Sequence, residues 1–556
     1  MGVLCFFVYL TNLRQIGAWD SIPARLLPFS ILRQGNLDFD EFTWLRRLNP
    51  HPYFLRQLPN GHWLSVYPIG VPVMMTPLYL PVTRWLEHHH IDDDDVRFRL
   101  ASVVMERISA ALLTAASVSL VFLAAAATAT PGVAVVLALI YGLGTSTWAI
   151  SSQALWQHGP AELGLAGLCL FLIAPNTRRN AVAAGGFAAL AVLARPTMML
   201  FALVALVFVW RERRSQFMFF LSLPVVGAGL LFAYNLRLVS IVTGGYQLKA
   251  FALPKLGALV GLLFSPNRGL FIYAPFTALA VPAVLRPSRA GPRWLAYAPI
   301  GIAGYLLLYS SWSGWWGGHC YGPRFLADIL PVLVLCAAQT VERLRRSREG
   351  RMLVAALAFW GIVVQAIGVY CDDNSWNALP TSVDVAPWRA WDWTDLQVLR
   401  AARTGWHGFD LAPLLWQALT QPQPALLEPI DRTDLVGEIT NESQLPLRLR
   451  GGGAGTLNLR ISNMSGVTWP AFSDFGYLQV WILYRWWFGG AVVDGEGGFV
   501  MLPRNLGPQE SASVRARIDP PTQRGSYELE LIVVQALDPT QGKTGNTLVR
   551  LPAEIE

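Results

Sequence analysis

Residues 178–214 read RRNAVAAGGFAALAVLARPTMMLFALVALVFVWRERR, two apolar runs that are bounded by arginine clusters and separated by Arg195. The same arrangement extends over the first two thirds of the chain, where arginine clusters fall in every second gap between apolar stretches. Basic loops confined to one side are typical of polytopic membrane proteins, in which those loops are cytoplasmic. The pattern therefore predicts an α-helical membrane protein and assigns a side to every loop. The clusters are Arg178 and Arg179; Arg211, Arg213 and Arg214; Arg286, Arg289 and Arg293; and the run from Arg343 to Arg351.

The composition favours the same class. Of 556 residues, 53% are hydrophobic and only 14% are charged, which is too apolar for a soluble protein of this length. The net charge of +7 is explained by the basic loops, and no basic stripe with interleaved aromatic residues predicts a nucleic-acid partner. The five cysteines lack the spacing of a zinc site. Cys320 and Cys371 fall on the same outer side, and we expect two unrelated thiols there rather than a disulfide.

The apolar stretches predict about eleven spans, because a spanning helix needs about 20 apolar residues, or fewer where it is bent. Placing the arginine clusters inside puts the alternate gaps outside, including residues 14–102, 151–160, 237–270 and 313–324. The stretch 66–86 contains four prolines, and we expect it to form a broken helix in the outer leaflet rather than a span. The expected spans are 1–13, 103–127, 133–150, 161–175, 181–194, 197–210, 216–236, 271–287, 294–312, 325–341 and 352–370.

The character of the chain changes after residue 370. Residues 436–556 contain short alternating runs such as TLNLRIS, YLQVWILY, SVRARI and YELELIVV, separated by turn residues. Such runs predict a C-terminal β-sandwich of about seven or eight strands outside the membrane. Residues 371–435 read as a connector. The predicted organisation is a membrane domain over 1–370 with a first outer loop at 14–102, the connector, and an extracytoplasmic β-sandwich domain.

The first outer loop carries the strongest resemblance to a known family. Asp20 follows the first span, an amphipathic segment around Pro28 comes next, and a glycine then precedes the acidic group Asp38, Asp40 and Glu41. This order resembles the GT-C glycosyltransferases, which include protein O-mannosyltransferases and lipid A aminoarabinose transferases. The resemblance covers residues 1–370 and includes the later segments YPIGVPVMMTPLYL, SSQALWQHGPAELGLAG, LARPT and YGPRFLADILP.

The resemblance implies an inverting transfer of a sugar from a polyprenyl-phosphate donor to a glycan, lipid or protein acceptor at the outer face. It implies that Asp20 is the general base. The family often has an Asp-Glu pair here, whereas this chain has Asp20 and Ser21, so a bound divalent metal is possible but not favoured, and we expect no other cofactor. The alternative is that Asp20 or Ser21 caps the following helix.

Other outer-side polar residues are candidates for the same site. His158 is a catalytic candidate in the second outer loop, with Glu162 one turn later; a histidine bonded only to neighbouring backbone is the alternative. Asp38 and Asp40 would contact substrate or belong to a solvated loop. Arg324 with Tyr321, in the glycine-rich WSGWWGGHCYGPR, would bind the donor phosphate. Arg195 and Arg268 are further phosphate candidates, and interfacial anchoring is the alternative for all these arginines.

Two other functions remain open. A transporter or flippase of lipid-linked glycans predicts mid-span charges and internal symmetry, and neither is evident. A non-catalytic scaffold that presents the β-domain leaves Asp20 and Arg324 without a reason to converge. We therefore expect an integral enzyme of a bacterial inner or plasma membrane that contacts membrane lipid.

Overall fold

The computed structural model describes most of the chain. The described residues are 1–14, 19–48, 52–236, 251–287, 291–372, 374–378, 381–406, 411–420, 429–443, 445–451, 455–471, 478–538 and 542–556.

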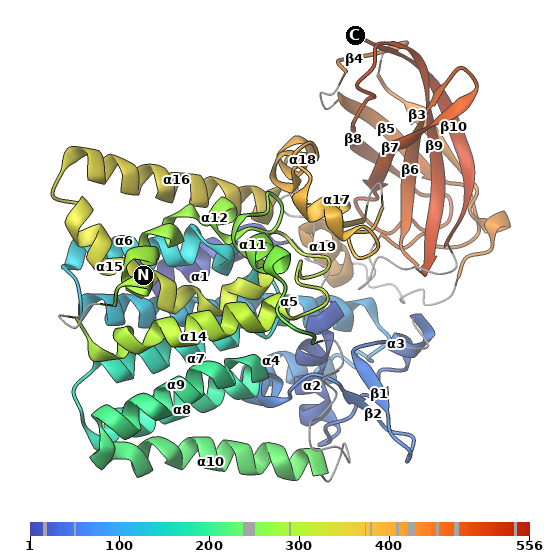
Figure 1. Ribbon diagram of the computed structural model, residues 1–556. Coiled ribbons are helices and arrows are strands. Elements are labelled where there is room, and N and C mark those ends of the chain that lie inside the picture. The colour runs from blue at the N-terminus through green and yellow to red at the C-terminus, as the bar shows by residue number, and fades with distance from the viewer. Residues whose placement is uncertain are drawn as a thin grey trace.

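Residues 1–370 form a layered bundle of helices that run side by side, and the β-rich region stands at one end of it (Figure 1). The helices of the bundle are α1 (Gly2–Leu10), α5 (Val96–Ala126), α6 (Pro131–Leu143), α7 (His158–Ile173), α8 (Arg178–Ala194), α9 (Met199–Glu212), α10 (Phe217–Tyr234), α11 (Leu256–Phe264), α12 (Leu270–Tyr273), α13 (Val281–Leu285), α14 (Arg293–Ser310), α15 (Leu330–Leu344) and α16 (Arg348–Tyr370).

Four helical segments of the described chain are long and apolar enough to cross a membrane: Arg97–Ala126, Arg214–Tyr234, Arg324–Leu344 and Arg348–Tyr370. The expected count of eleven spans is not supported. Each expected segment does contain helix, but α1 has 9 residues and α6 has 13. Segment 271–287 is divided into short pieces around Pro275 and Pro282. Hydropathy alone did not reveal where these helices begin and end, and they fall short of the roughly 20 residues that a crossing needs.

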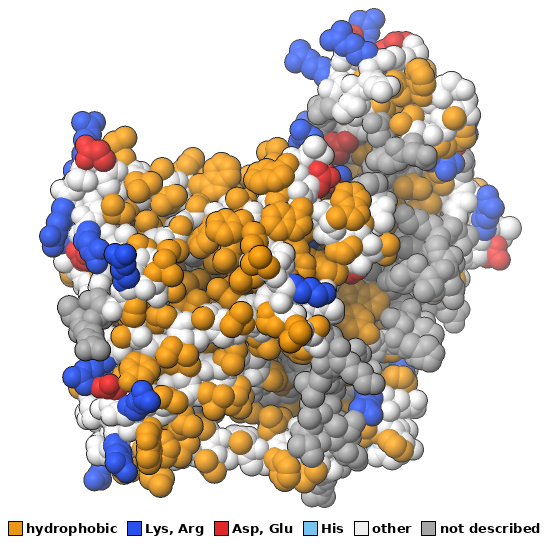
Figure 2. All heavy atoms as spheres, in the orientation of Figure 1, with side chains coloured by type: hydrophobic (Ala, Val, Ile, Leu, Met, Phe, Trp, Pro, Cys, Tyr) orange, Lys and Arg blue, Asp and Glu red, His pale blue; other side chains and the backbone are white. Residues whose placement is uncertain are grey.

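The basic residues are concentrated at one edge of the bundle in the view shown. Figure 2 shows Lys and Arg side chains along the edge where Figure 1 places the turn between α15 and α16, and hydrophobic side chains across the surface between that edge and the other end. The first outer loop and the β-rich region lie at the opposite end (Figure 1). This separation of charge follows the order of arginine clusters in the sequence.

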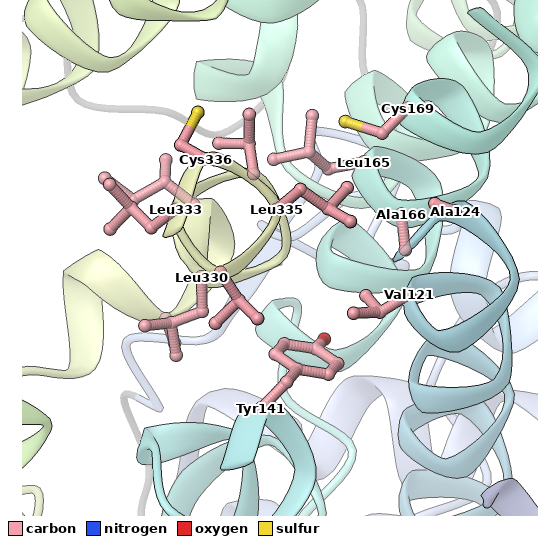
Figure 3. Packing of buried hydrophobic residues seen from close by; sticks show 14 of the residues in the cluster. Val121, Ala124, Tyr141, Leu165, Ala166, Cys169, Leu330, Leu333, Leu335 and Cys336 are labelled. Carbon is pink, nitrogen blue, oxygen red and sulfur yellow. The ribbon is translucent and has the colours of Figure 1, made fainter. Parts of the chain in front are cut away.

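The centre of the bundle is built around α15. Figure 3 shows Leu330 and Leu335 of α15 pointing toward Tyr141 of α6, Val121 of α5 and Leu165 of α7, and all of these side chains are buried. Small residues let neighbouring helices approach closely, because a Cβ on Gly164 of α7 would lie 2.7 Å from the Cβ of Ala191 in α8. The candidate site lies at the outer end of this core.

The first outer loop folds against the bundle. It contains α2 (Ile22–Arg33), α3 (Thr43–Leu48), β1 (Leu55–Gln57), β2 (Trp63–Ser65) and α4 (Gly70–His88). The segment expected to be a broken helix instead forms the single helix α4, with Pro77 and Pro81 inside it. Helix α2 is largely buried against α4 and α5 rather than lying at an interface, and its Arg25 lies 3.8 Å from Glu106 of α5.

The C-terminal region is β-rich, which confirms that expectation. It contains one five-stranded sheet in the order β4-β10-β9-β6-β7 and one three-stranded sheet in the order β3-β5-β8. All strand pairs are antiparallel except β4 with β10. Their shared core also takes in Leu100 and Val103 of α5. The strands are β3 (Gly437–Asn441), β4 (Leu447–Leu449), β5 (Gly455–Asn463), β6 (Val480–Phe488), β7 (Ala491–Met501), β8 (Ser511–Ile518), β9 (Gly525–Asp538) and β10 (Gly542–Ile555).

The connector contains the short helices α17 (Ser375–Ala378), α18 (Gln397–Thr404) and α19 (Leu411–Thr420). The α19 backbone N–H of Leu411 donates to the carbonyl of Leu13 at the end of α1. All five cysteines are free thiols, as expected.

Candidate functional site

Asp20, which lies just before α2, and Arg324, at the start of the helical segment that leads into α15, form an ion pair. Oδ2 of Asp20 lies 2.5 Å from Nη2 of Arg324, and both side chains are largely buried, at 22% and 17% exposure. Because 304 residues separate them in the sequence, it is the tertiary fold that brings them into contact. The expectation that these two residues lie together is therefore met in the geometry, while their chemical roles stay predictions.

Asp20 is held by residues of the first outer loop. It belongs to a single 3-10 turn, Trp19–Ser21, immediately before α2. Its Oδ1 accepts hydrogen bonds from the hydroxyls of Tyr53 at 2.6 Å and Tyr67 at 2.9 Å. Ser21 is the N-cap of α2 and makes no side-chain capping hydrogen bond. The contacts of the Asp20 carboxylate thus come from distant segments, which argues against the alternative that its main task is capping.

The surroundings of Asp20 favour its ionised form. Burial by itself would raise the pKa of Asp20, but the charge of Arg324 and the hydroxyl groups of Tyr53 and Tyr67 together hold this pKa below its ordinary value. Burial and the nearby Asp20 charge raise the pKa of both tyrosines well above the usual range, so both remain protonated donors. Asp20 is thus an ionised carboxylate near neutral pH, as a general base requires.

Replacing Tyr67 with Phe should change the pH dependence of any reaction that needs ionised Asp20. The Tyr67 hydroxyl stabilises the charged carboxylate, so its removal raises the pKa of Asp20. Activity is lost as the pH falls through that pKa, and the acid limb of the pH–rate profile should therefore move to higher pH. The rate plateau at neutral pH should be retained. An acid limb that stays in place, or moves to lower pH, in Tyr67→Phe would contradict this assignment.

Arg324 lies on an aromatic surface and keeps unused donors. Its guanidinium carbon lies 4.5 Å from the ring centre of Trp156, within cation–π range. The Nε of Arg324 and the Nε1 of Trp156 are both buried and have no hydrogen-bond partner among the described residues. Each of these two groups thus has a donor available for a bound acceptor. Trp156 was not among the expected site residues, although it lies in the second outer loop, residues 151–160.

The loop before Arg324 is shaped by glycine. Gly317, Gly318 and Gly322 adopt positive φ angles of 85°, 68° and 68°. A side chain on Gly322 would also lie 2.5 Å from the ring of Tyr273. These glycines allow the loop to turn tightly and to deliver Arg324 to the start of the helical segment that continues into α15.

A pocket opens beside Asp20. It has room for roughly one water molecule, and it is lined by the Asp20 carboxylate and by apolar residues of α2 and α4. Its polar lining includes Ser65, Tyr67 and Gln157. The apolar lining residues are Pro23, Ala24, Leu27, Pro68, Val71, Pro72 and Leu155.

A second charged cluster lies behind Trp156 and centres on Asp328. The Oδ1 of Asp328 lies 2.6 Å from Nδ1 of His158, and its Oδ2 lies 2.6 Å from Nε of Arg195. Tyr305 also donates to Asp328. Arg195 is 5.7 Å from the ring centre of Phe325, which Arg324 approaches to the same distance. His158 and Arg195 were expected at the site, and the fold brings them together around an acid that was not expected.

Tyr321 and Arg268, which were expected to contact the donor phosphate, make other contacts in the structure. Tyr321 donates to the carbonyl of Val364 in α16 and does not reach Arg324 through any described contact. Arg268 is 1% exposed and donates only to neutral oxygens. The acceptors of Arg268 are the carbonyls of Asn267, Trp316 and Gly318 and the side chains of Asn377 and Gln397. The fold uses Arg268 to join the glycine-rich loop to the connector.

The remaining expected acids lie apart from Asp20. Glu162 is buried in α7 and accepts from Tyr141 and Ser151. Asp38 and Asp40 approach His62, with Asp40 2.5 Å and Asp38 3.8 Å from the Nδ1 atom. One ligand atom from each of these three residues falls within 4.8 Å of the others, the only such group in the described part of the chain. These contacts join two parts of the first outer loop, the segment after α2 and the residue before β2.

No family model matches the sequence, and no curated protein is similar to it. Among solved structures, one match is the Pseudomonas fluorescens alkylpurine DNA glycosylase AlkC bound to DNA containing an abasic site analog. It is 13% identical, with 80% of this chain and 99% of that chain covered, at a TM-score of 0.16. A likeness at this TM-score carries no argument about the chain.

Proposed function

We propose that the protein is an integral-membrane glycosyltransferase of the GT-C type that acts at the outer face of the membrane. Its donor is a sugar on a polyprenyl phosphate, and its acceptor is a hydroxyl group on a glycan, lipid or protein. The acceptor oxygen forms a bond to C1 of the sugar while the bond from C1 to the phosphate oxygen breaks, which inverts C1. The acceptor proton passes to Asp20, and the electron pair of the broken bond remains on the lipid phosphate.

The observation that carries this proposal is the placement of an ionised carboxylate beside buried, unused donors. Asp20 contacts Arg324 directly, and Nε of Arg324 and Nε1 of Trp156 lack partners in the described residues. A phosphate oxygen satisfies both donors, and a guanidinium also stabilises the charge that develops on the leaving phosphate. Asp20 would thus serve the attacking acceptor hydroxyl, and Arg324 with Trp156 would serve the leaving phosphate.

The pocket beside Asp20 has the polarity of an amphipathic substrate, but it has room for roughly one water molecule and would have to widen to admit such a substrate. Its polar end meets the carboxylate, and its wall is formed by apolar residues of α2 and α4. A polyprenyl-phosphate sugar has the same division between a polar head and a lipid tail. A flippase remains the second candidate, but none of the described contacts specifically favours it.

A transfer assay tests the proposal. Purified protein in lipid nanodiscs is incubated with a panel of polyprenyl-phosphate sugars, and release of free polyprenyl phosphate is measured with and without membrane extracts as a source of acceptor. We expect one donor to be consumed and its sugar to be transferred with inversion. If no donor of the panel is consumed while labelled donor crosses the bilayer, the flippase function replaces this proposal.

Replacing Arg324 with Gln should weaken donor use. Removing a charge-assisted hydrogen bond typically costs about 1.5–3 kcal/mol, or roughly a 10- to 100-fold increase in donor KM. Asp20 also loses its counter-charge, so the acid limb of activity should move to higher pH. Arg33→Gln is a matched control, because Arg33 and Asp93 form a comparable partly buried pair in the same loop. Equal donor KM values in Arg324→Gln and wild type would reject the phosphate assignment.

A further inference from the structure

The connector exposes several large apolar side chains. Trp388 is 67% exposed, Trp393 64% and Trp406 63%. Soluble surfaces rarely carry so many large apolar side chains together. We call this set the connector face; it consists of Val385, Trp388, Trp391, Trp393, Leu399 and Trp406.

Two long polar side chains of the same segment, Arg389 and Gln397, point inward, whereas Asp384 is exposed. Arg389 is 2% exposed, pairs with Asp395 at 2.9 Å and stacks on Trp376. Gln397 is fully buried, donates to the carbonyl of Cys320 and accepts from Arg268. The polar interior is thus internally satisfied, and the connector face does not result from a loose or unfolded segment. A rigid element with polar groups inside and tryptophan outside is suited to an apolar environment.

The connector face continues the apolar surface of the helices. Trp406 stacks on Tyr370, the last residue of α16, with a ring separation of 4.6 Å and an interplanar angle of 9°. Trp391 lies 6.4 Å from Trp315, whose ring covers Gly261 of α11. Helix α16 is one of the four segments able to cross a membrane. Figure 1 places α17 and α18 at the end of α16 remote from the arginine-rich edge, and Figure 2 shows hydrophobic side chains reaching that end.

We propose that the connector face lies in the headgroup region of the lipid bilayer and anchors the outer end of the bundle there. Tryptophan is enriched at this depth, because its ring is apolar and its N–H finds polar partners. The occupant of the face is lipid, since the face is continuous with the exposed surface of a candidate span. This inference concerns lipid contact and does not depend on glycosyl transfer.

Fluorescence quenching in nanodiscs tests this placement. A background of Cys371→Ser removes the one native cysteine that is not buried. Trp388→Cys and Trp393→Cys are each labelled with an environment-sensitive dye, and Met464→Cys, 47% exposed in the β-rich region, is the control. We expect nitroxide lipids labelled near the headgroup to quench positions 388 and 393 strongly and position 464 weakly, and aqueous iodide to show the reverse order.

Two outcomes overturn the inference. Iodide quenching at 388 and 393 as strong as at 464 would place the connector face in water. Protection from both iodide and nitroxide lipid would mean that a protein covers it. A label-free measurement guards against perturbation by the dye: in brominated lipid, Trp388→Phe with Trp393→Phe should lower the quenched fraction of tryptophan emission, whereas Trp487→Phe in the β-rich region should not. An unchanged or larger quenched fraction in the double variant also rejects the proposal.

Discussion

Asp20→Asn should reduce sugar transfer by about 10²- to 10⁴-fold, the usual contribution of a positioned general base. The amide keeps the shape of the carboxylate but cannot accept the proton of the acceptor hydroxyl. The measurement is the steady-state rate of donor consumption with saturating donor, using the donor identified in the panel. Donor binding should persist, because Arg324 retains its guanidinium and loses only its counter-charge.

Asp93→Asn is the matched control for this loss. Asp93 pairs with Arg33 at 2.5 Å with 18% exposure, which closely parallels the pair formed by Asp20. Both substitutions break a partly buried ion pair in the first outer loop, so both should have comparable effects on stability. Only Asp20→Asn should abolish turnover. Wild-type turnover in Asp20→Asn would remove Asp20 from the mechanism, and equal losses in both variants would assign the effect to the fold of the loop.

The direct contact between Asp20 and Arg324 has a mechanistic consequence. In the substrate-free protein the guanidinium holds the carboxylate in its less basic state. A donor phosphate that draws Arg324 toward itself would weaken this contact and raise the pKa of Asp20. The base would then gain strength when the donor is in place, which limits unproductive proton uptake beforehand.

Asp328→Asn should destabilise the bundle by about 3–5 kcal/mol, the usual cost of removing one partner of a buried ion pair. Asp328 is fully buried and is the only carboxylate whose contacts with Arg195 and His158 are described. Without it, the Arg195 cation stays buried without its counter-charge. The measurement is the denaturant or thermal unfolding of purified protein in detergent, compared with wild type.

A double variant separates charge imbalance from lost packing. Asp328→Asn combined with Arg195→Met removes both charges and should recover a large part of the lost stability. If the double variant is less stable than Asp328→Asn alone, the cluster is held by packing and hydrogen bonding rather than by charge compensation. Wild-type stability in the single variant would contradict the prediction outright.

The sequence predicted the class of fold better than its detail. Alternating runs gave β5, β6, β8 and β9, because one buried face imposes a period of two on each strand. They did not reveal β10, which nonetheless pairs with β9 along most of its length. Apolar runs located the helices, but hydropathy does not show where a helix ends, and so the expected count of eleven spans is not supported.

Part of the candidate site could be predicted from the sequence, because the charge pattern shows which loops share a side. Charge patterning assigned sides to loops, and that assignment brought Asp20 and Arg324 to one face. Tyr53, Tyr67 and Trp156 were missed, because their contacts depend on how the first outer loop folds back on the bundle. Asp328 carried a usable signal, since a lone acid within an apolar helical run is costly unless it is paired. The expectation that Tyr321 and Arg268 contact the phosphate rested only on their position near a membrane face. Position does not reveal the direction in which a side chain points.

The packing of the β-rich region against α5 limits how far this region can move. Leu100 and Val103 are almost fully buried within the core of that region. Exposing both side chains would cost about 3–6 kcal/mol, so fewer than about one molecule in a hundred would have this domain swung away at any moment. The β-rich region is thus held in one position against α5 rather than moving as a separate domain.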